Sequence, residues 1–418
     1  MSEQTEKPVA SGLPQGAAMQ RNVVRRRTRG KIWRGVFLSS TLIGLIALAL
    51  LLFTIINDSF GLIAVEYKVD PATLSERPLV DLSKDELTAV LQENISKNSF
   101  RTLERDKPMA DRSQDDVLGL IYERVVKQDV AKTWTLADSL LNRSAIEAEV
   151  AKDFPDAKLE FRSWLSGGFL TTPMSSNALI AGVRTALFGS LWMIAITILF
   201  AFPIGVGAAI YLEEYARDNR FNRIIQTNIN NLAGVPSIIY GMLGLAVFVR
   251  MLEPVTSGRI FGVEGGNGRT ILSASLTMML LILPIIIINA QEAIRAVPLS
   301  LRQASYGLGA TKWQTIRHHV LPNAMPGILT GTILAVSRAI GETAPLIVVG
   351  ASTFIVSDPD GPFSKFTALP IQIYEWTSRA QGEFANIAAA AIVVLLAMLL
   401  TLNSIAVLLR NRLSRRAS

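Results

Sequence analysis

The sequence contains no cysteine, and this absence excludes disulfides, thiolate metal sites and cysteine nucleophiles. Its two histidines, His318 and His319, are adjacent, so on a helix they would point to different sides, which is poor geometry for one metal ion. No stretch matches the P-loop pattern of a glycine-rich turn ending in lysine and serine or threonine. We therefore expect no metal site in this chain and no ATP hydrolysis by the usual P-loop route.

Charged residues are also scarce, and the sequence contains long apolar runs. Only 18% of the 418 residues are charged and 50% are hydrophobic. Several runs approach the roughly 20 residues that cross the hydrocarbon of a bilayer. The runs cover residues 35–56, 178–212, 224–251, 271–290, 324–350 and 387–409. The sequence therefore predicts an all-α integral membrane protein with six transmembrane helices, of which the last five form a core at residues 178–409.

The first run, residues 35–56, is longer than a signal-peptide core and lacks an obvious small-residue cleavage site after it. We interpret it as an uncleaved anchor helix.

The net charge of +7 is concentrated beside the apolar runs. The basic segments are residues 1–34, 213–223, 293–322 and 410–418, whereas the segments near 252–270 and 351–385 carry fewer cations. By the positive-inside rule the basic segments are cytoplasmic, which places both termini on that side. The basic residues could orient the helices or contact nucleic acid, and their position beside the apolar runs favours orientation. We therefore expect them to contact membrane lipid and no nucleic acid.

Residues 57–177 differ abruptly in composition, because charged residues occur throughout and no run is long enough to cross a bilayer. Ser83 with Glu86 has the form of a capping box, and apolar residues then recur at helical spacing. Ser113 precedes a second such segment. We predict a mostly helical extracytoplasmic insert between the first two spans, with short loops such as residues 104–112.

The basic segment 293–322 has the pattern of two short helices at a turn. Pro298 suits the first turn of one helix, Gly307 and Gly309 allow a sharp break, and Pro322 would close the second helix. From spacing alone, the segment is either an interfacial linker or a docking element for another protein.

Particular residues in this segment resemble a known motif. Gln303-Ala304-Ser305, then Gly309, then Leu321-Pro322 are similar to the EAA loop of ABC importer permeases. That loop reads Glu-Ala-Ala, three residues, Gly, nine residues, Ile-x-Leu-Pro, so Gln303, Ser305 and His319 depart from it. The resemblance implies a coupling helix that sits in a cleft of the ATP-hydrolysing subunit.

A charged pair lies in the fifth apolar run. Arg338 is about 16 Å along a helix from Gly327, near the bilayer midplane, where a charge costs about 2.5–3.5 kcal/mol. Glu342 is four residues on and would share its helical face. The pair either packs helices or contacts an anion on its path, with Arg338 binding its oxygens, and we favour the path. Arg184, near the outer end of the second span, either snorkels to the interface or lines the path, and we favour snorkelling.

Three segments, residues 337–346, 234–241 and 369–374, resemble the A-type permease of bacterial phosphate ABC importers, and the likeness covers about residues 178–416. It implies a type I ABC importer permease fold in the inner membrane, which forms half of an alternating-access path for inorganic phosphate. It further implies a C-type permease partner, ATPase subunits that carry ATP and magnesium, and a periplasmic phosphate-binding protein, with no cofactor in this chain. Alternatives are a permease for a related oxyanion and a secondary phosphate carrier or channel.

Overall fold

The computed structural model describes residues 17–75, 77–106, 108–263 and 267–417. Its first helix, α1 (Ala17–Asp58), has an apolar window of mean hydropathy 2.6 and begins within the basic segment that we predicted as a tail. Residues 1–16 of that predicted tail lie outside the described residues. The chain divides into two compact units, Met1–Ile55 and Ile56–Ser418.

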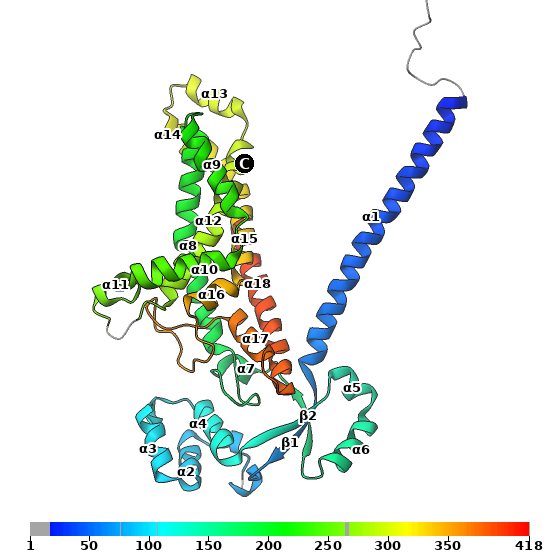
Figure 1. Cartoon of the computed structure of the whole chain (residues 1–418), viewed down its shortest axis with the longest axis vertical. Helices are drawn as coiled ribbons and strands as arrows, with labels where there is room; N and C mark the ends of the chain where they lie inside the picture. The colour runs from blue at the N-terminus through cyan, green and yellow to red at the C-terminus, as the bar shows by residue number, and fades with distance from the viewer. Residues whose placement is uncertain (1–16, 76, 107, 264–266, 418) are drawn as a thin grey trace, which may run out of the picture. The chain divides into compact units, whose positions relative to one another are not determined.

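Five helices in the described residues are long and apolar enough to cross a membrane, and a bent helix pair gives a sixth span if it is counted as one. The helical segments of the second unit from Arg184 onward (Figure 1) are α8 (Arg184–Ile210), α9 (Arg220–Ala233), α10 (Ser237–Gly244), α11 (Glu253–Thr256), α12 (Ile271–Arg295), α13 (Leu299–Gly307), α14 (Lys312–Thr315), α15 (Leu321–Ile340), α16 (Ala344–Val349), α17 (Leu369–Thr377) and α18 (Gly382–Ala417). Single π-helical segments follow α8 (Tyr211–Tyr215), α10 (Leu245–Met251) and α14 (Ile316–Val320), and a 3-10 turn covers Arg259–Phe261.

The third predicted span is not a continuous helix. α9 and the helix that starts at Ser237 are bent by 107° at the break between them. The break holds Gly234, Val235 and Pro236, and Pro236 caps α10 with extended backbone. A proline lacks the N–H that would continue a helix and restricts the residue before it, so a bend here is expected physically. Prediction from hydropathy missed it because the two halves pass a hydropathy test when they are taken together.

The fifth span differs from its prediction at both ends. Pro322 does not close a helix, because α14, the π-helical segment and α15 run on as one helix from Lys312 to Ile340. Pro322 lies inside this helix, just after the π-helical segment Ile316–Val320, where the regular α-helical hydrogen-bond ladder is already interrupted. At the other end the helix stops at Ile340, before Gly341, and the short α16 with Pro345 in its first turn follows. The run predicted to continue to residue 350 is therefore broken.

The long helices of the core pack around α12, which contacts α8 and α15, and α15 in turn contacts α18 (Figure 1). α12 buries many side chains along its length, including Ile271, Met278, Ile282 and Ile286. α18 extends as a helix to Ala417, through much of the segment that we predicted as a basic tail. The loop helices α13 and α14 lie at one end of these helices and the insert lies at the opposite end (Figure 1).

The predicted insert, residues 57–177, contains short helices and also a sheet that the sequence analysis missed. Its strands are β1 (Phe60–Tyr67), β2 (Gln128–Thr133) and β3 (Lys158–Ser163), which pair antiparallel in the order β2-β1-β3. Its α-helices are α2 (Lys84–Asn94), α3 (Lys97–Asp106), α4 (Gln114–Ile121), α5 (Leu136–Leu141), α6 (Arg143–Asp153) and α7 (Gly167–Thr171). Short 3-10 turns cover Pro71–Thr73, Leu79–Asp81 and Met109–Asp111, and a π-helical segment covers Tyr122–Val126.

The two predicted helix starts in the insert are confirmed. Ser83 and Glu86 form a capping box at α2, and Ser113 forms one with Asp116 at α4. The side chains of Leu87, Leu91, Val117 and Ile121 are fully buried between these helices. We call residues 71–125, which contain α2 to α4, the helical lobe.

The sheet joins the insert to the membrane helices. Ile63 and Val65 of β1 and Trp164 after β3 belong to the same buried cluster as Trp376 of α17 and Phe384 of α18. Because one core contains side chains of both parts, the insert and the membrane helices fold as parts of one unit.

Candidate functional site

Arg338 and Glu342 lie together, but not midway along a continuous span. Arg338 is in the last turn of α15, and Glu342 follows the helix end. The Arg338 Nε lies 3.3 Å from the Glu342 Oε1, so the predicted pair is formed even though the backbone is broken between the two residues. A cation in the last turn of a helix interacts favourably with the helix dipole.

The guanidinium of Arg338 keeps bonding capacity in this arrangement. Within the described part of the chain, its only side-chain hydrogen bond is the one from Nε to Glu342, which leaves the two terminal nitrogens available. The side chain of Arg338 is 45% exposed and that of Glu342 is 19% exposed. An arginine with two free terminal N–H groups can bind two oxygens of one oxyanion. The arrangement can therefore hold an anion.

The short helix α16, which follows this pair in the sequence, packs against α10. A Cβ placed on Gly241 of α10 would lie only 2.7 Å from the Cα of Pro345 in α16. The absence of a side chain at Gly241 lets the two short helices approach this closely. In Figure 1, α10 and α16 lie across the direction of the long helices. Ser337 also donates to Asn403 of α18 at 2.8 Å, which ties the end of α15 to the last helix.

The predicted docking loop has the expected turn. Gly309 has a φ of +81°, a conformation that favours glycine, and α14 then starts at a capping box between Thr311 and Gln314. The Ser305 and Thr315 hydroxyls lie 2.9 Å apart and are buried, so Ser305 holds the two loop helices together. Gln303, Ala304 and Gly309 are exposed, whereas Leu321 and Pro322 are half-buried at the start of α15.

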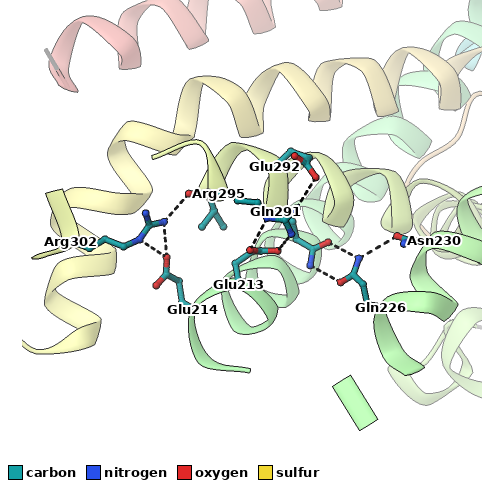
Figure 2. Close-up of polar contacts among 9 residues, drawn as sticks. Glu213, Glu214, Gln226, Asn230, Gln291, Glu292, Arg295 and Arg302 are labelled. Carbon is teal, nitrogen blue, oxygen red and sulfur yellow. Dashed lines mark hydrogen bonds and ion pairs between the residues drawn. The ribbon is translucent and has the colours of Figure 1, made fainter. Parts of the chain in front are cut away.

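Sequence analysis missed a set of ion pairs that connects this loop to the core. Figure 2 shows Glu213 and Glu214, in the π-helical segment that continues α8, reaching two arginines from different elements. Arg302 of α13 donates to Glu214 at 3.0 Å, and Arg295 of α12 donates to Glu213 at 2.6 Å. The signal was present, because two acidic residues follow the second span and arginines follow the fourth. We counted only cations when assigning sides.

A pair of amides connects the neighbouring helices. Gln226 of α9 donates to Gln291 of α12 at 3.1 Å, and Gln291 donates back at 2.8 Å (Figure 2). Gln291 is buried, where an unpaired polar group is costly, and the amide of Gln226 satisfies it. α9 and α12 are therefore joined by a reciprocal polar contact close to the ion pairs.

Arg184, which we expected to snorkel, has specific partners instead. Its Nε lies 2.9 Å from an Asp358 carboxylate oxygen, and its Nη1 donates to the Thr171 carbonyl at 2.6 Å. Thr185 donates to the same carboxylate at 3.0 Å. The loop that holds Asp358 is thus fastened to the start of α8. Within the described residues, no group of three or more histidine, aspartate or glutamate side chains is placed to hold a metal ion.

Comparisons with known proteins identify the family. The family model described as "Binding-protein-dependent transport system inner membrane component" matches residues 201–418. The chain is 34% identical over 238 residues to "Probable ABC transporter permease protein YqgI" of Bacillus subtilis, covering 55% of this chain and 76% of that protein. It is also 34% identical over 237 residues to "Phosphate transport system permease protein PstA 1" of Mycobacterium tuberculosis, covering 56% of this chain and 72% of that protein.

Among solved structures, the chain is similar to one of the MetNI methionine ABC transporter in inward-facing conformations. The TM-score is 0.41 at 21% sequence identity, and the match covers 59% of this chain and 100% of that one. The family match spans more than half of the sequence and includes the docking loop and the Arg338–Glu342 pair. The chain therefore belongs to the family of binding-protein-dependent transport system inner membrane components.

Proposed function

We propose that this chain is the membrane-spanning subunit of an ATP-driven importer of inorganic phosphate, and that it forms half of an alternating-access path. The assignment of phosphate as the substrate depends on the 34% identity to a protein named as a phosphate transport permease. A further relative of that name, from Mycobacterium leprae, is 36% identical. The family comprises membrane subunits of ABC transporters, which act in a multi-pass inner-membrane complex with separate ATPase subunits.

Arg338 is the residue that we assign to the phosphate path, with Glu342 as its partner. The terminal nitrogens of Arg338 would bind phosphate oxygens, and Glu342 would hold the guanidinium when no anion is present. The half-exposed position of Arg338, at a break between two helices, supports this assignment because an anion can reach it. A pair that only packed helices would be expected to be more buried.

We assign the docking role to the loop of α13 and α14, in which the residues of the EAA-like motif are Gln303, Ala304, Ser305, Gly309, Leu321 and Pro322. Its partner would be an ATPase subunit that binds ATP and magnesium. Support comes from the exposed apolar side chains at the loop, since Leu308 is 90% exposed and Trp313 is 54% exposed. The other proposed partners are a C-type permease subunit and a periplasmic phosphate-binding protein. No cofactor is assigned to this chain.

The loop and the insert lie at opposite ends of the long helices, which supports a cytoplasmic loop and an extracytoplasmic insert (Figure 1). With an even number of spans, both termini would then be cytoplasmic. Tags at either end should be protected from protease in intact spheroplasts, and a tag between Leu140 and Leu141 of the insert should be cleaved. Cleavage at either terminus would contradict this topology.

The function is tested by reconstituting the chain in vesicles with its ATPase, its partner permease and the phosphate-binding protein. We expect phosphate uptake that requires ATP and the binding protein. Uptake by the chain without the ATPase would instead identify a secondary carrier or channel. Competition by sulfate, arsenate or a phosphonate in excess over phosphate would identify a permease for a related oxyanion.

A further inference from the structure

The ion pair between Arg302 and Glu214 is the most enclosed one in the described part of the chain. The side chain of Arg302 is 13% exposed and that of Glu214 is 7% exposed. Both Nε and Nη2 of Arg302 lie within hydrogen-bond distance of the Glu214 Oε1, at 3.2 Å and 3.0 Å. A charge-assisted contact of this kind, shielded from water, is stronger and more rigid than an exposed pair.

The same guanidinium also holds the end of α12. Its Nη1 donates to the Val297 carbonyl at 2.6 Å, and its Nη2 donates to the Ile294 carbonyl at 2.8 Å. These carbonyls lie at the end of α12 and in the turn before α13, where backbone acceptors lack helical partners. One side chain of the docking helix therefore joins three elements, namely α13, the end of α12 and the end of α8.

Glu214 differs from its neighbour Glu213 in what it reaches. Successive residues of a helix project in different directions, so the two carboxylates meet different arginines (Figure 2). Glu213 reaches Arg295, which belongs to α12 and is 60% exposed. Glu214 reaches Arg302, which belongs to the docking helix itself. Among the ion pairs of the described residues, only the Arg302–Glu214 pair connects α13 to α8.

We propose that the Arg302–Glu214 ion pair is the link through which movement of the docking helix α13 displaces α8 during transport. This inference rests on the proposed function as an ABC importer subunit. α8 and the π-helical segment after it, which holds Glu214, form one helix of 32 residues from Tyr215 back to Arg184, or about 48 Å, and the Asp358 loop is attached at Arg184. A displacement applied at Glu214 would thus reach the opposite end of the core along one helix.

The test compares two neighbouring glutamates with the same isosteric change. Glu214→Gln removes the charge that binds α13 to α8, while the bonds from Arg302 to the two carbonyls of α12 can remain. Glu213→Gln is the matched control, because it breaks an ion pair within reach of α12 only. The complete complex with its ATPase, partner permease and binding protein is reconstituted in vesicles. Phosphate uptake, ATP hydrolysis and co-purification of the ATPase are then measured together.

We expect Glu214→Gln to retain the ATPase and to hydrolyse ATP, but to lower phosphate uptake per ATP by about tenfold, because both contacts of Arg302 with Oε1 of residue 214 lose their charge assistance. Glu213→Gln should stay within about twofold of the wild type, because Arg295, the partner of Glu213, is 60% exposed to solvent. Glu214→Asp, which keeps the charge, should recover at least half of the lost coupling.

Wild-type uptake per ATP in Glu214→Gln would overturn the inference. So would loss of ATPase binding in Glu214→Gln, because the pair would then serve only to fold the docking loop. An equal loss of coupling in both glutamine variants would also overturn it, since the Arg302–Glu214 pair would then matter no more for coupling than the Arg295–Glu213 pair. If the wild-type complex takes up no phosphate, the proposed function is wrong, and this is known before any variant is tested.

Discussion

Arg338 shows how a charge can be accommodated at the end of a membrane helix. It lies in the last turn of α15, where the helix dipole and the partner Glu342 both interact favourably with a positive charge. The terminal nitrogens remain available because only Nε is used by Glu342. The sequence predicted the pair from i, i+4 spacing on one continuous helix, but the contact is formed across a helix end.

At this residue we predict that Arg338→Gln lowers phosphate uptake by about tenfold or more, because charged hydrogen bonds to the anion are lost. The assembled complex should remain intact. Uptake of labelled phosphate by reconstituted vesicles measures the effect. Arg379→Gln is the matched control, since it breaks a pair of the same i, i+4 spacing with Glu375, at 3.4 Å, and should leave uptake unchanged. Normal uptake in Arg338→Gln would remove this residue from the path.

A second residue-scale prediction concerns Tyr67 in the insert. The Tyr67 hydroxyl donates a hydrogen bond to the Glu160 carboxylate at 3.2 Å. Burial, together with this nearby carboxylate, raises the pKa of Tyr67 from 10.0 to about 12. The folded chain therefore holds this proton more strongly than the unfolded chain. The stability contributed by the neutral hydroxyl is complete below pH 10 and is lost as the pH rises toward 12.

We expect the unfolding temperature of the wild type to fall more steeply than that of Tyr67→Phe between pH 10 and pH 12. Thermal unfolding of the detergent-purified chain, followed by circular dichroism at several pH values, provides the comparison. Parallel pH dependences of the two proteins would show that the Tyr67 hydroxyl has no part in the alkaline loss.

At the scale of elements, the docking loop depends on one backbone conformation. Gly309 has a φ of +81°, whereas Gly307 ends α13 with a negative φ and open space at its Cβ position. We predict that Gly309→Val uncouples ATP hydrolysis from transport, because a side chain in the left-handed region costs about 1–2 kcal/mol and the loop would rearrange. Gly307→Ala is the control and should behave as the wild type. The measurement is the ratio of phosphate uptake to ATP hydrolysis in vesicles. Wild-type coupling in Gly309→Val would refute the docking role assigned to the loop.

The breaks in the third and fifth spans show the limit of reading elements from hydropathy. A hydropathy window averages composition over many residues, so it continues across Gly234 to Pro236 and across Gly341 to Pro345. The glycines and prolines were visible in the sequence, and their effect on a helix follows from local chemistry. What could not be inferred is that the helices after the two breaks, α10 and α16, pack against each other, which depends on the close approach of Gly241 to Pro345.

At the scale of the whole molecule, the insert has two parts that differ in their connection to the core. The helical lobe has its own buried cluster, and its ends are adjacent, because the Val69 N–H donates to the Val126 carbonyl at 3.2 Å. The sheet instead shares buried side chains with the membrane helices, among them Trp164, which is 3% exposed. Loss of one such tryptophan costs about 3–5 kcal/mol.

We therefore predict that replacing residues 71–125 by a short glycine-serine linker leaves the rest of the chain folded, whereas deletion of residues 60–165 does not. Size-exclusion chromatography and thermal unfolding in detergent distinguish the two deletion variants. Aggregation of the shorter deletion, to the same extent as the longer one, would show that the lobe is also required for folding.

The sequence by itself determined the apolar spans, the two capped helices of the insert, the turn at Gly309 and the family resemblance. Each of these depends on residues close together in the chain, where composition, spacing and proline or glycine chemistry act directly. The tertiary structure decided that the sheet shares a core with α17 and α18, and that Arg302 meets Glu214. These contacts join residues far apart in sequence. Burial of apolar surface and pairing of charges select them only once the chain is folded.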